Sequence, residues 1–216
     1  PARAEHGDPG YAVWPAEEVA LPTNARVMAL SVNGLAPEVT ELARRTPRLV
    51  GGGEVVPLRI VDEFRGHDWG SYGTSGFVLE PARPLRPLTR YELCEDQAGG
   101  QLCLGGWTTA RGADRRPPVW TGPPHPYPTQ REYYQYGFEL PVRDDGPLLI
   151  AVTATRPGQK QRVLFGLNDR FAPQGCVSLI LDQPVGTRRR FLITFTAYDV
   201  PGHRRVGEPA ADPDRL

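Results

Sequence analysis

The sequence predicts an all-β protein, built as two antiparallel β-sandwiches in tandem with one short helix. Glycine and proline number 24 each among the 216 residues, and they separate short apolar runs in the way that turns separate strands. A β-sandwich commonly takes about 100 residues, so the chain has room for two. A single larger sandwich is the alternative, because one all-β domain can reach about 200–250 residues.

The first half contains several runs with strand character. We expect strands at residues 11–14, 26–32, 54–64, 77–80, 91–94 and 102–109. The glycines at 51–53 are expected to break the chain, and Pro57 to interrupt the strand that follows, because proline cannot donate to a β-ladder. The one helical segment is 37–45, where Pro37 suits the first helical position.

The second half repeats this style, with strands expected at residues 133–140, 148–155, 162–168, 176–182 and 191–200. The last strand has the clearest alternation, because Phe191, Ile193, Phe195 and Ala197 fall on one face. Between the halves, residues 110–118 are charged and end in two prolines, which makes them the best candidate for a linker. The sequence therefore predicts a first domain at 1–110 with an N-terminal arm, and a second at 111–216 with a C-terminal tail.

Two of the three cysteines are placed to form a disulfide. In a hairpin whose two-residue turn is at 98–99, Cys94 lies opposite Cys103. Ladder alternation makes them a non-hydrogen-bonded pair with Cα atoms about 4.5 Å apart, within the range that a disulfide spans. The bridge would imply an oxidising compartment; two reduced thiols that merely face each other are the alternative. Cys176 is left over, and we expect a buried free thiol there, with a reactive or intermolecular thiol as the alternative.

Residues 21–110 resemble the bacterial Ig-like domains of cell-envelope and surface proteins. The segment LPTN at 21–24 is similar to the opening of such domains, LEPARPLRPLTRY at 79–91 to their central L-x-P…L-x-x-x-T-x-Y segment, and WTT at 107–109 to their final strand. The segment FTAYD at 195–199, followed by Gly202, indicates a weaker second copy. The resemblance implies tandem Ig-like or fibronectin III-like sandwiches in an envelope setting, and it carries no catalytic residue.

The most distinctive stretch is HPYPTQREYYQYGF, whose tyrosines form a candidate binding patch of Tyr127, Tyr133, Tyr134 and Tyr136. Tyrosine combines a large contact area with a polar tip, which suits recognition of proteins or sugars. A strand here would place Tyr134, Tyr136 and Phe138 on one face. Burial of that face in the core is the structural alternative. A buried face and a binding patch can exist together if Tyr127 and Tyr133 are exposed.

The sequence assigns no metal ligand, cofactor or catalytic residue. His67-Asp68 invites a copper site, for which a polar loop is the simpler interpretation. Asp144-Asp145, followed by glycine, predicts a hairpin turn. A calcium site is the second interpretation, and it would need six to eight oxygen ligands. No pattern in the sequence singles out two acidic residues as a carboxylate pair for glycoside hydrolysis. We therefore expect a protein that is not an enzyme.

Charge and hydropathy narrow the class of partner. The 25 basic and 25 acidic residues cancel, which argues against nucleic acid, and no apolar stretch approaches the ~20 residues of a membrane-spanning helix. We expect a secreted or envelope-associated structural or interaction module, located in the periplasm, at the outer membrane or outside the cell. Its partner would be a protein or cell-surface component in adhesion or envelope assembly. The alternative is a periplasmic or secreted module that binds carbohydrate or a metal ion.

Overall fold

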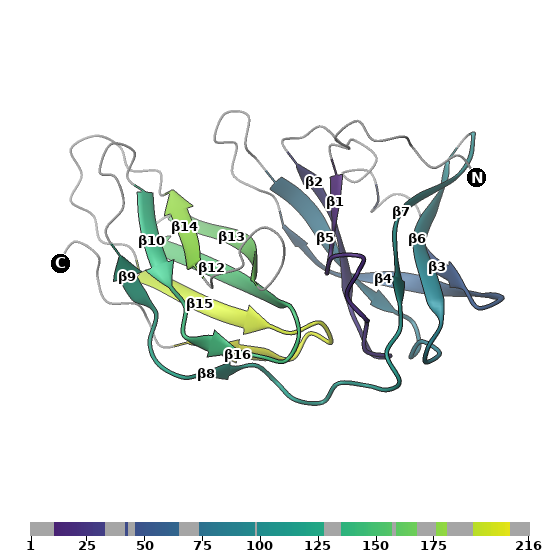
Figure 1. The fold of residues 1–216 in the computed structure, drawn as a ribbon. Helices are drawn as coiled ribbons and strands as arrows, with labels where there is room; N and C mark the ends of the chain where they lie inside the picture. The colour runs from purple at the N-terminus through teal and green to yellow at the C-terminus, as the bar shows by residue number, and fades with distance from the viewer. Residues whose placement is uncertain are drawn as a thin grey trace. The chain divides into compact units, whose positions relative to one another are not determined.

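The computed structural model describes residues 11–32, 42, 46–64, 74–97, 99–127, 135–156, 159–167, 176–180 and 192–207. Its named strands all pair antiparallel, which confirms the all-β prediction. The chain divides into two compact units, Pro1–Asp114 and Arg115–Leu216, whose strands are shown in Figure 1. Of the predicted helical segment, Leu42 alone is described, and its side chain is fully buried. No helix among the described residues combines the length and apolar character needed to cross a membrane.

Among its described residues, the first unit has seven strands, hydrogen-bonded in the order β1-β2-β5-β4-β3-β6-β7. They are β1 (Tyr11–Trp14), β2 (Val27–Val32), β3 (Arg48–Gly51), β4 (Glu54–Phe64), β5 (Thr74–Pro81), β6 (Arg90–Gln97) and β7 (Gly100–Thr108). β4 changes partner along its length, because its beginning pairs with β3 and the remainder with β5. The strands therefore curl around a common core, and β1 comes to lie beside β7 (Figure 1).

Pro57 does not interrupt β4, contrary to the prediction. The strand is continuous from Glu54 to Phe64, and Pro57 lies where its pairing passes from β3 to β5. The carbonyl of Pro57 accepts the Ala82 N–H at 2.9 Å, and the next N–H in the strand, that of Leu58, donates at 3.1 Å to a carbonyl before β3. Because the partner changes at this residue, a missing N–H there leaves the ladders on both sides intact.

The three glycines after Val50 form a tight hairpin between β3 and β4. Gly51 pairs with Glu54, and the two residues between them have φ angles of 57° and 74°. Two successive positive φ angles are typical of a type I′ turn, which glycine adopts without steric cost. Gly51 is required for a second reason, since a Cβ there would collide with the backbone carbonyl of Arg90 at the start of β6. The short β3 strand was not predicted from the sequence.

The core of the first unit lies between the strands that curl around it. Trp107 is fully buried, and its indole Nε1 donates to the carbonyl of Pro15 at 2.8 Å. Burying a large apolar side chain stabilises a fold by about 1.5–3 kcal/mol, so this core is the main source of stability. Its other fully buried members include Val27, Ala29, Leu49, Leu79, Tyr91 and Leu93.

The chain crosses from the β1 edge to the β7 edge immediately after β1. Leu21 N–H donates to Thr108 O at 3.0 Å, and Ala110 N–H donates to Leu21 O at 2.6 Å, which makes a short parallel bridge. Further along, the Asn24 side-chain amide donates to the Asp114 carbonyl at 2.8 Å and accepts the Asp114 N–H at 3.0 Å. The beginning of the predicted linker is therefore held against the first unit.

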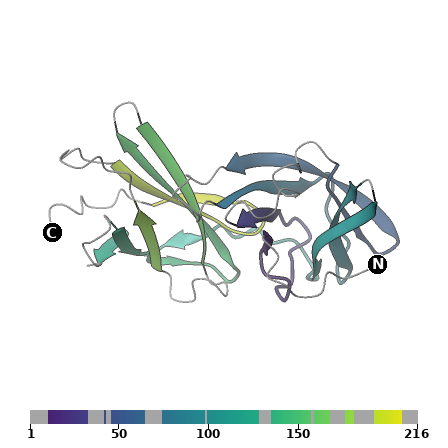
Figure 2. The same cartoon turned by 90° about the horizontal axis from the view of Figure 1, so that it is seen from above.

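In the part of the second unit that the structure describes, the strands form three sheets, with orders β14-β10-β9, β11-β8 and β13-β12-β15-β16. The strands are β8 (Val119–Trp120), β9 (His125–Tyr127), β10 (Gln135–Glu139), β11 (Val142–Arg143), β12 (Leu148–Arg156), β13 (Gln159–Leu167), β14 (Cys176–Ile180), β15 (Leu192–Tyr198) and β16 (Arg204–Val206). Figure 2 shows these strands from above. This order differs from that of the first unit.

The core of the second unit joins its two larger sheets. Phe138 of β10 and Phe195 of β15 are both fully buried, and their rings meet edge to face with centroids 5.0 Å apart. In β15, Ile193, Phe195 and Ala197 are buried while the residues between them are not. This alternation confirms, for the described residues of that strand, the prediction that Ile193, Phe195 and Ala197 share one face, and it shows that this face is the buried one.

Candidate functional site

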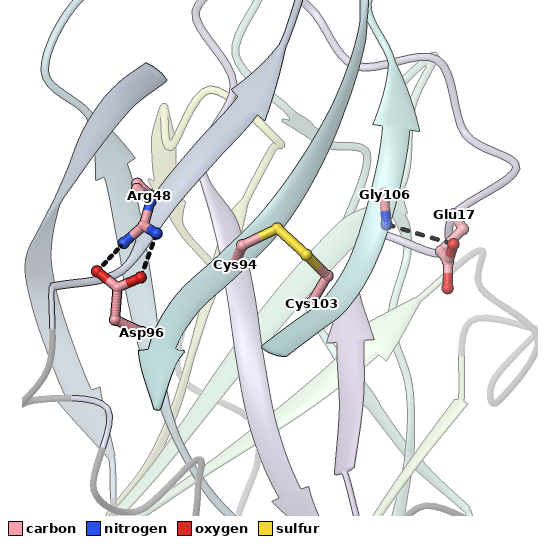
Figure 3. The surroundings of a disulfide bond; sticks show 6 residues. All are labelled: Glu17, Arg48, Cys94, Asp96, Cys103 and Gly106. Atoms are coloured by element: carbon pink, nitrogen blue, oxygen red, sulfur yellow. Dashed lines mark hydrogen bonds and ion pairs between the residues drawn. A yellow bond between two sulfur atoms is a disulfide. The ribbon is translucent and has the colours of Figure 1, made fainter. Parts of the chain in front are cut away.

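A disulfide joins the two strands of the β6–β7 hairpin (Figure 3). Cys94 and Cys103 lie directly opposite each other, with Cα atoms 4.0 Å apart and sulfur atoms 2.11 Å apart. The ladder continues without a shift from this pair to Gln97 and Gly100 next to the turn. The predicted register of the hairpin tip is therefore confirmed.

A β-bulge adjoins the disulfide. Leu93 pairs with Gly105 whereas Cys94 pairs with Cys103, so Leu104 is an extra residue on β7. Leu93 is fully buried, and because side chains alternate along a strand, the disulfide lies on the opposite, outer face of β6. Cys94 is only 1% exposed, while Cys103 is exposed to solvent. The bulge was not predicted from the sequence.

An ion pair flanks the disulfide on the side of β3 (Figure 3). The Arg48 guanidinium makes two parallel bonds to Asp96, Nη1 to Oδ2 at 2.6 Å and Nη2 to Oδ1 at 2.5 Å. The hydrogen bond from Arg48 lowers the pKa of Asp96, and the same bond raises the pKa of Arg48. Asp96 is 68% exposed, so solvent screens the charges. The two parallel bonds therefore orient β3 against the hairpin and add little to the stability of the fold.

The outer edge of β7 is covered by the segment that follows β1. The Gly106 N–H donates to Glu17 Oε2 at 3.3 Å, on the far side of the hairpin from Arg48 (Figure 3). Nearby, a Cβ at Gly105 would come to 2.7 Å from Val13 Cγ2, so β1 packs closely against this part of β7. An occupied edge discourages uncontrolled strand pairing, which leaves the tip and outer face of the hairpin as its accessible parts.

A polar network lies at the other end of β6. The Tyr91 hydroxyl donates to Glu54 and accepts the Arg86 N–H at 3.2 Å, and Glu54 Oε2 pairs with Arg83 at 2.9 Å and Arg86 at 3.1 Å. Burial, followed by the bond to Glu54, raises the pKa of Tyr91. The hydrogen bond from Tyr91, followed by that from Arg83, lowers the pKa of Glu54. The network ties the start of β4 to the loop before β6.

A second polar pair closes the turn between β15 and β16. Asp199 is buried, and its carboxylate accepts the His203 backbone N–H at 2.6 Å and contacts the imidazole Nδ1 at 2.7 Å. The Asp199 N–H in turn donates to the His203 carbonyl at 3.1 Å. The reciprocal bonds around Pro201 and Gly202 are those of a turn-closing device. The four-residue spacing of aspartate and histidine across a Pro-Gly turn is the signal that could have predicted it.

The candidate tyrosine patch lies partly within the described residues. Tyr127 belongs to β9 and pairs with Gly137 of β10, the strand that also contains Tyr136. Tyr133 and Tyr134 lie outside the described residues. The two positions thus lie on neighbouring strands but on opposite faces of the sheet, because position 127 shares its face with Gly137. The patch itself stays a prediction.

The remaining sequence-based candidates fall in different places. His67-Asp68 lies outside the described residues. Cys176 opens β14 and pairs along the ladder with Glu139, while its state as a free thiol stays a prediction. Asp145, which forms an ion pair with Arg116, follows β11 in a bend rather than in the predicted hairpin turn. The hairpin prediction is wrong because β11 pairs with β8, whereas β12 pairs with β13 and β15.

Comparisons with protein-family models and with curated proteins found no match for this chain. The structure therefore places the chain in the class of all-β proteins. It has two compact units, and the first contains a disulfide-bridged hairpin.

Proposed function

We propose that the chain is a non-catalytic interaction module that acts outside the reducing cytoplasm, in adhesion or envelope assembly. Its partner would be a protein or a cell-surface component. The observation that carries the proposal is the Cys94–Cys103 disulfide across an accessible hairpin. Structural disulfides persist in oxidising settings and are rare in the cytosol, which favours the periplasm, the outer membrane surface or the cell exterior.

The Ig-like character of the first unit is part of this proposal. The strand order β1-β2-β5-β4 and β3-β6-β7 corresponds to the ABED and CFG sheets of an immunoglobulin-type sandwich. Tyr91, at the start of β6, accepts the backbone N–H of Arg86 at 3.2 Å, as the tyrosine of an Ig-like corner does near the start of strand F. The disulfide departs from the antibody pattern, because it joins two neighbouring strands rather than two sheets. The strand order of the second unit does not support the same proposal there.

The bridged hairpin suits recognition because its shape is fixed before a partner arrives. Asp96, Gly99 and Gln101 are exposed around its tip. The disulfide holds β6 and β7 in register, and the bond from Arg48 fastens β6 to β3. A binding loop that is already ordered loses less conformational entropy on association. We therefore place the contact surface at the tip and outer face of the β6–β7 hairpin.

Site-specific photocrosslinking in the producing cells tests this proposal. A photoreactive amino acid replaces Gln101 at the hairpin tip, and the matched control replaces Arg143, an exposed residue of β11. We expect a discrete adduct with a protein or envelope component from the Gln101 position and none from the Arg143 position. The same adducts from both positions, or none from either, would contradict a partner surface at the hairpin.

Carbohydrate binding is the second candidate function. It rests on the predicted tyrosine patch, since aromatic side chains with polar tips suit sugars. Strand alternation puts position 127 on the sheet face opposite the fully buried Phe138. Binding to a glycan array that is lost in a Tyr127→Ala variant would support it. An array signal that this variant keeps would contradict it.

A further inference from the structure

Three potential metal ligands cluster on the outer face of the β6–β7 hairpin. Donor atoms of Glu92, Cys94 and Cys103 all lie within 4.8 Å of one another. Glu92 and Cys94 are two residues apart on one strand and therefore share a face, and Cys103 lies directly across from Cys94. Glu92 and Cys103 are exposed and Cys94 is buried, so the cluster is open to solvent on one side. Two sulfurs and a carboxylate are a donor set that zinc accepts.

A glycine gives the Glu92 side chain room above β7. Gly106 pairs with Glu92 across the ladder, and a Cβ at Gly106 would come to 3.1 Å from Glu92 Cγ and 3.0 Å from the Tyr91 carbonyl. A larger residue at Gly106 would therefore push the carboxylate stem away. With glycine there, Glu92 stays beside the sulfurs.

We infer that reduction of the disulfide converts this cluster into a binding site for a thiophilic divalent cation such as Zn²⁺. A dithiol reductant supplies two electrons and two protons, its own sulfurs form a disulfide, and the bond between Cys94 and Cys103 breaks to give two thiols. Binding of the cation then displaces the two thiol protons. Two thiolates and the Glu92 carboxylate supply three ligands, and water supplies the fourth, as in other zinc sites with three protein ligands.

The backbone spacing fits such a site without rearrangement. A tetrahedral centre with Zn–S bonds of about 2.3 Å holds its two sulfurs roughly 3.8 Å apart. The Cα atoms of Cys94 and Cys103 are 4.0 Å apart, so two thiolates that extend side by side from unmoved strands reach this separation. A bound cation would keep the two strands linked after the covalent bond between them is gone.

Cobalt titration of the reduced protein tests the inference. The full chain in a Cys176→Ser background is reduced with dithiothreitol, desalted without oxygen and titrated with Co²⁺. We expect thiolate-to-cobalt charge-transfer absorption that saturates at one ion per chain and disappears when Zn²⁺ is added. The oxidised protein should show no such band. Absence of the band in the reduced protein would overturn the inference.

Two further variants separate this site from adventitious binding to thiols. Glu92→Gln should weaken Co²⁺ affinity at least tenfold, whereas Glu139→Gln, at an exposed position of β10, should leave it unchanged. Equal affinity in both would show that the carboxylate is not a ligand and would overturn the site. If reduction loosens the hairpin, Zn²⁺ should still raise the Tm of the reduced chain, but not that of a Cys94→Ala, Cys103→Ala variant. A Tm that Zn²⁺ leaves unchanged in the reduced chain would contradict the inference.

Discussion

Removing the disulfide should destabilise the first unit by an amount that follows from the length of the loop it closes. The two cysteines are nine residues apart, and the chain-entropy relation gives about 2.6 kcal/mol at 25 °C for a loop of that length. Alanine is the better replacement for both, because Cys94 is buried and a serine hydroxyl there would add a desolvation cost of its own.

Urea denaturation provides the assay. The Cys94→Ala, Cys103→Ala variant should lose about 2–3 kcal/mol of unfolding free energy, or about 10–20 °C in Tm for a unit of this size. Cys176→Ala, which leaves the bridge intact, is the matched control for the loss of a thiol. Reduction of the unsubstituted chain should reproduce the effect of the double variant.

The loss of stability should also be confined to the strands around the disulfide. Amide hydrogen exchange should accelerate in β6, β7 and the paired β3, and stay unchanged in the strands of the second unit. A change in unfolding free energy below about 0.5 kcal/mol would refute the entropic argument, since it is far below the value that the loop length gives. Faster exchange spread evenly over both units would refute the assignment of the disulfide as a local brace.

Three further predictions concern the first unit. Tyr91→Phe should lower the unfolding free energy by about 1–2 kcal/mol in urea denaturation. The Tyr91 hydroxyl lowers the pKa of Glu54, so the Glu54 carboxylate stabilises the fold above its ordinary pKa of 4.5, and this contribution is lost as the pH falls through the folded-state pKa. The variant should therefore lose less stability on acidification than the unsubstituted chain. Gly51→Ala should lower the unfolding free energy by more than about 2 kcal/mol, because its Cβ meets a backbone carbonyl of β6. The control Gly112→Ala, with open space around it, should change that free energy by less than about 0.5 kcal/mol. Asn24→Ala should release the segment that this amide holds after β7, which limited trypsin digestion would detect as faster cleavage between the units; an unchanged rate would show that the amide is dispensable.

The local parts of the fold could be predicted from the sequence. The disulfide register follows from a turn of small residues and the alternation of a single hairpin, and it needs no information from elsewhere in the chain. The core face of β15 follows in the same way from Ile193, Phe195 and Ala197. Both depend on side-chain spacing within one or two neighbouring strands, which is the signal that a sequence states most directly.

The parts that were missed depend on residues far apart in the sequence. The β3 strand has four residues, too few for alternation to distinguish it from a loop. The continuity of β4 through Pro57 depends on the change of partner strand, which sequence spacing does not encode. The bond between Tyr91 and Glu54 joins positions 37 residues apart. The pairing of β11 with β8, rather than with the strand that follows Asp145, likewise reflects tertiary packing.

The most direct test of the account is the redox state of the cysteines in the protein as its own cells make it. Cells are lysed in denaturant with a thiol-alkylating reagent, and the chain is digested without reduction and analysed by mass spectrometry. We predict a peptide pair linked through Cys94 and Cys103, together with alkylated Cys176. Alkylation of both Cys94 and Cys103 would contradict it, because an interaction module based on a covalently bridged hairpin would then not be the form present in the cell.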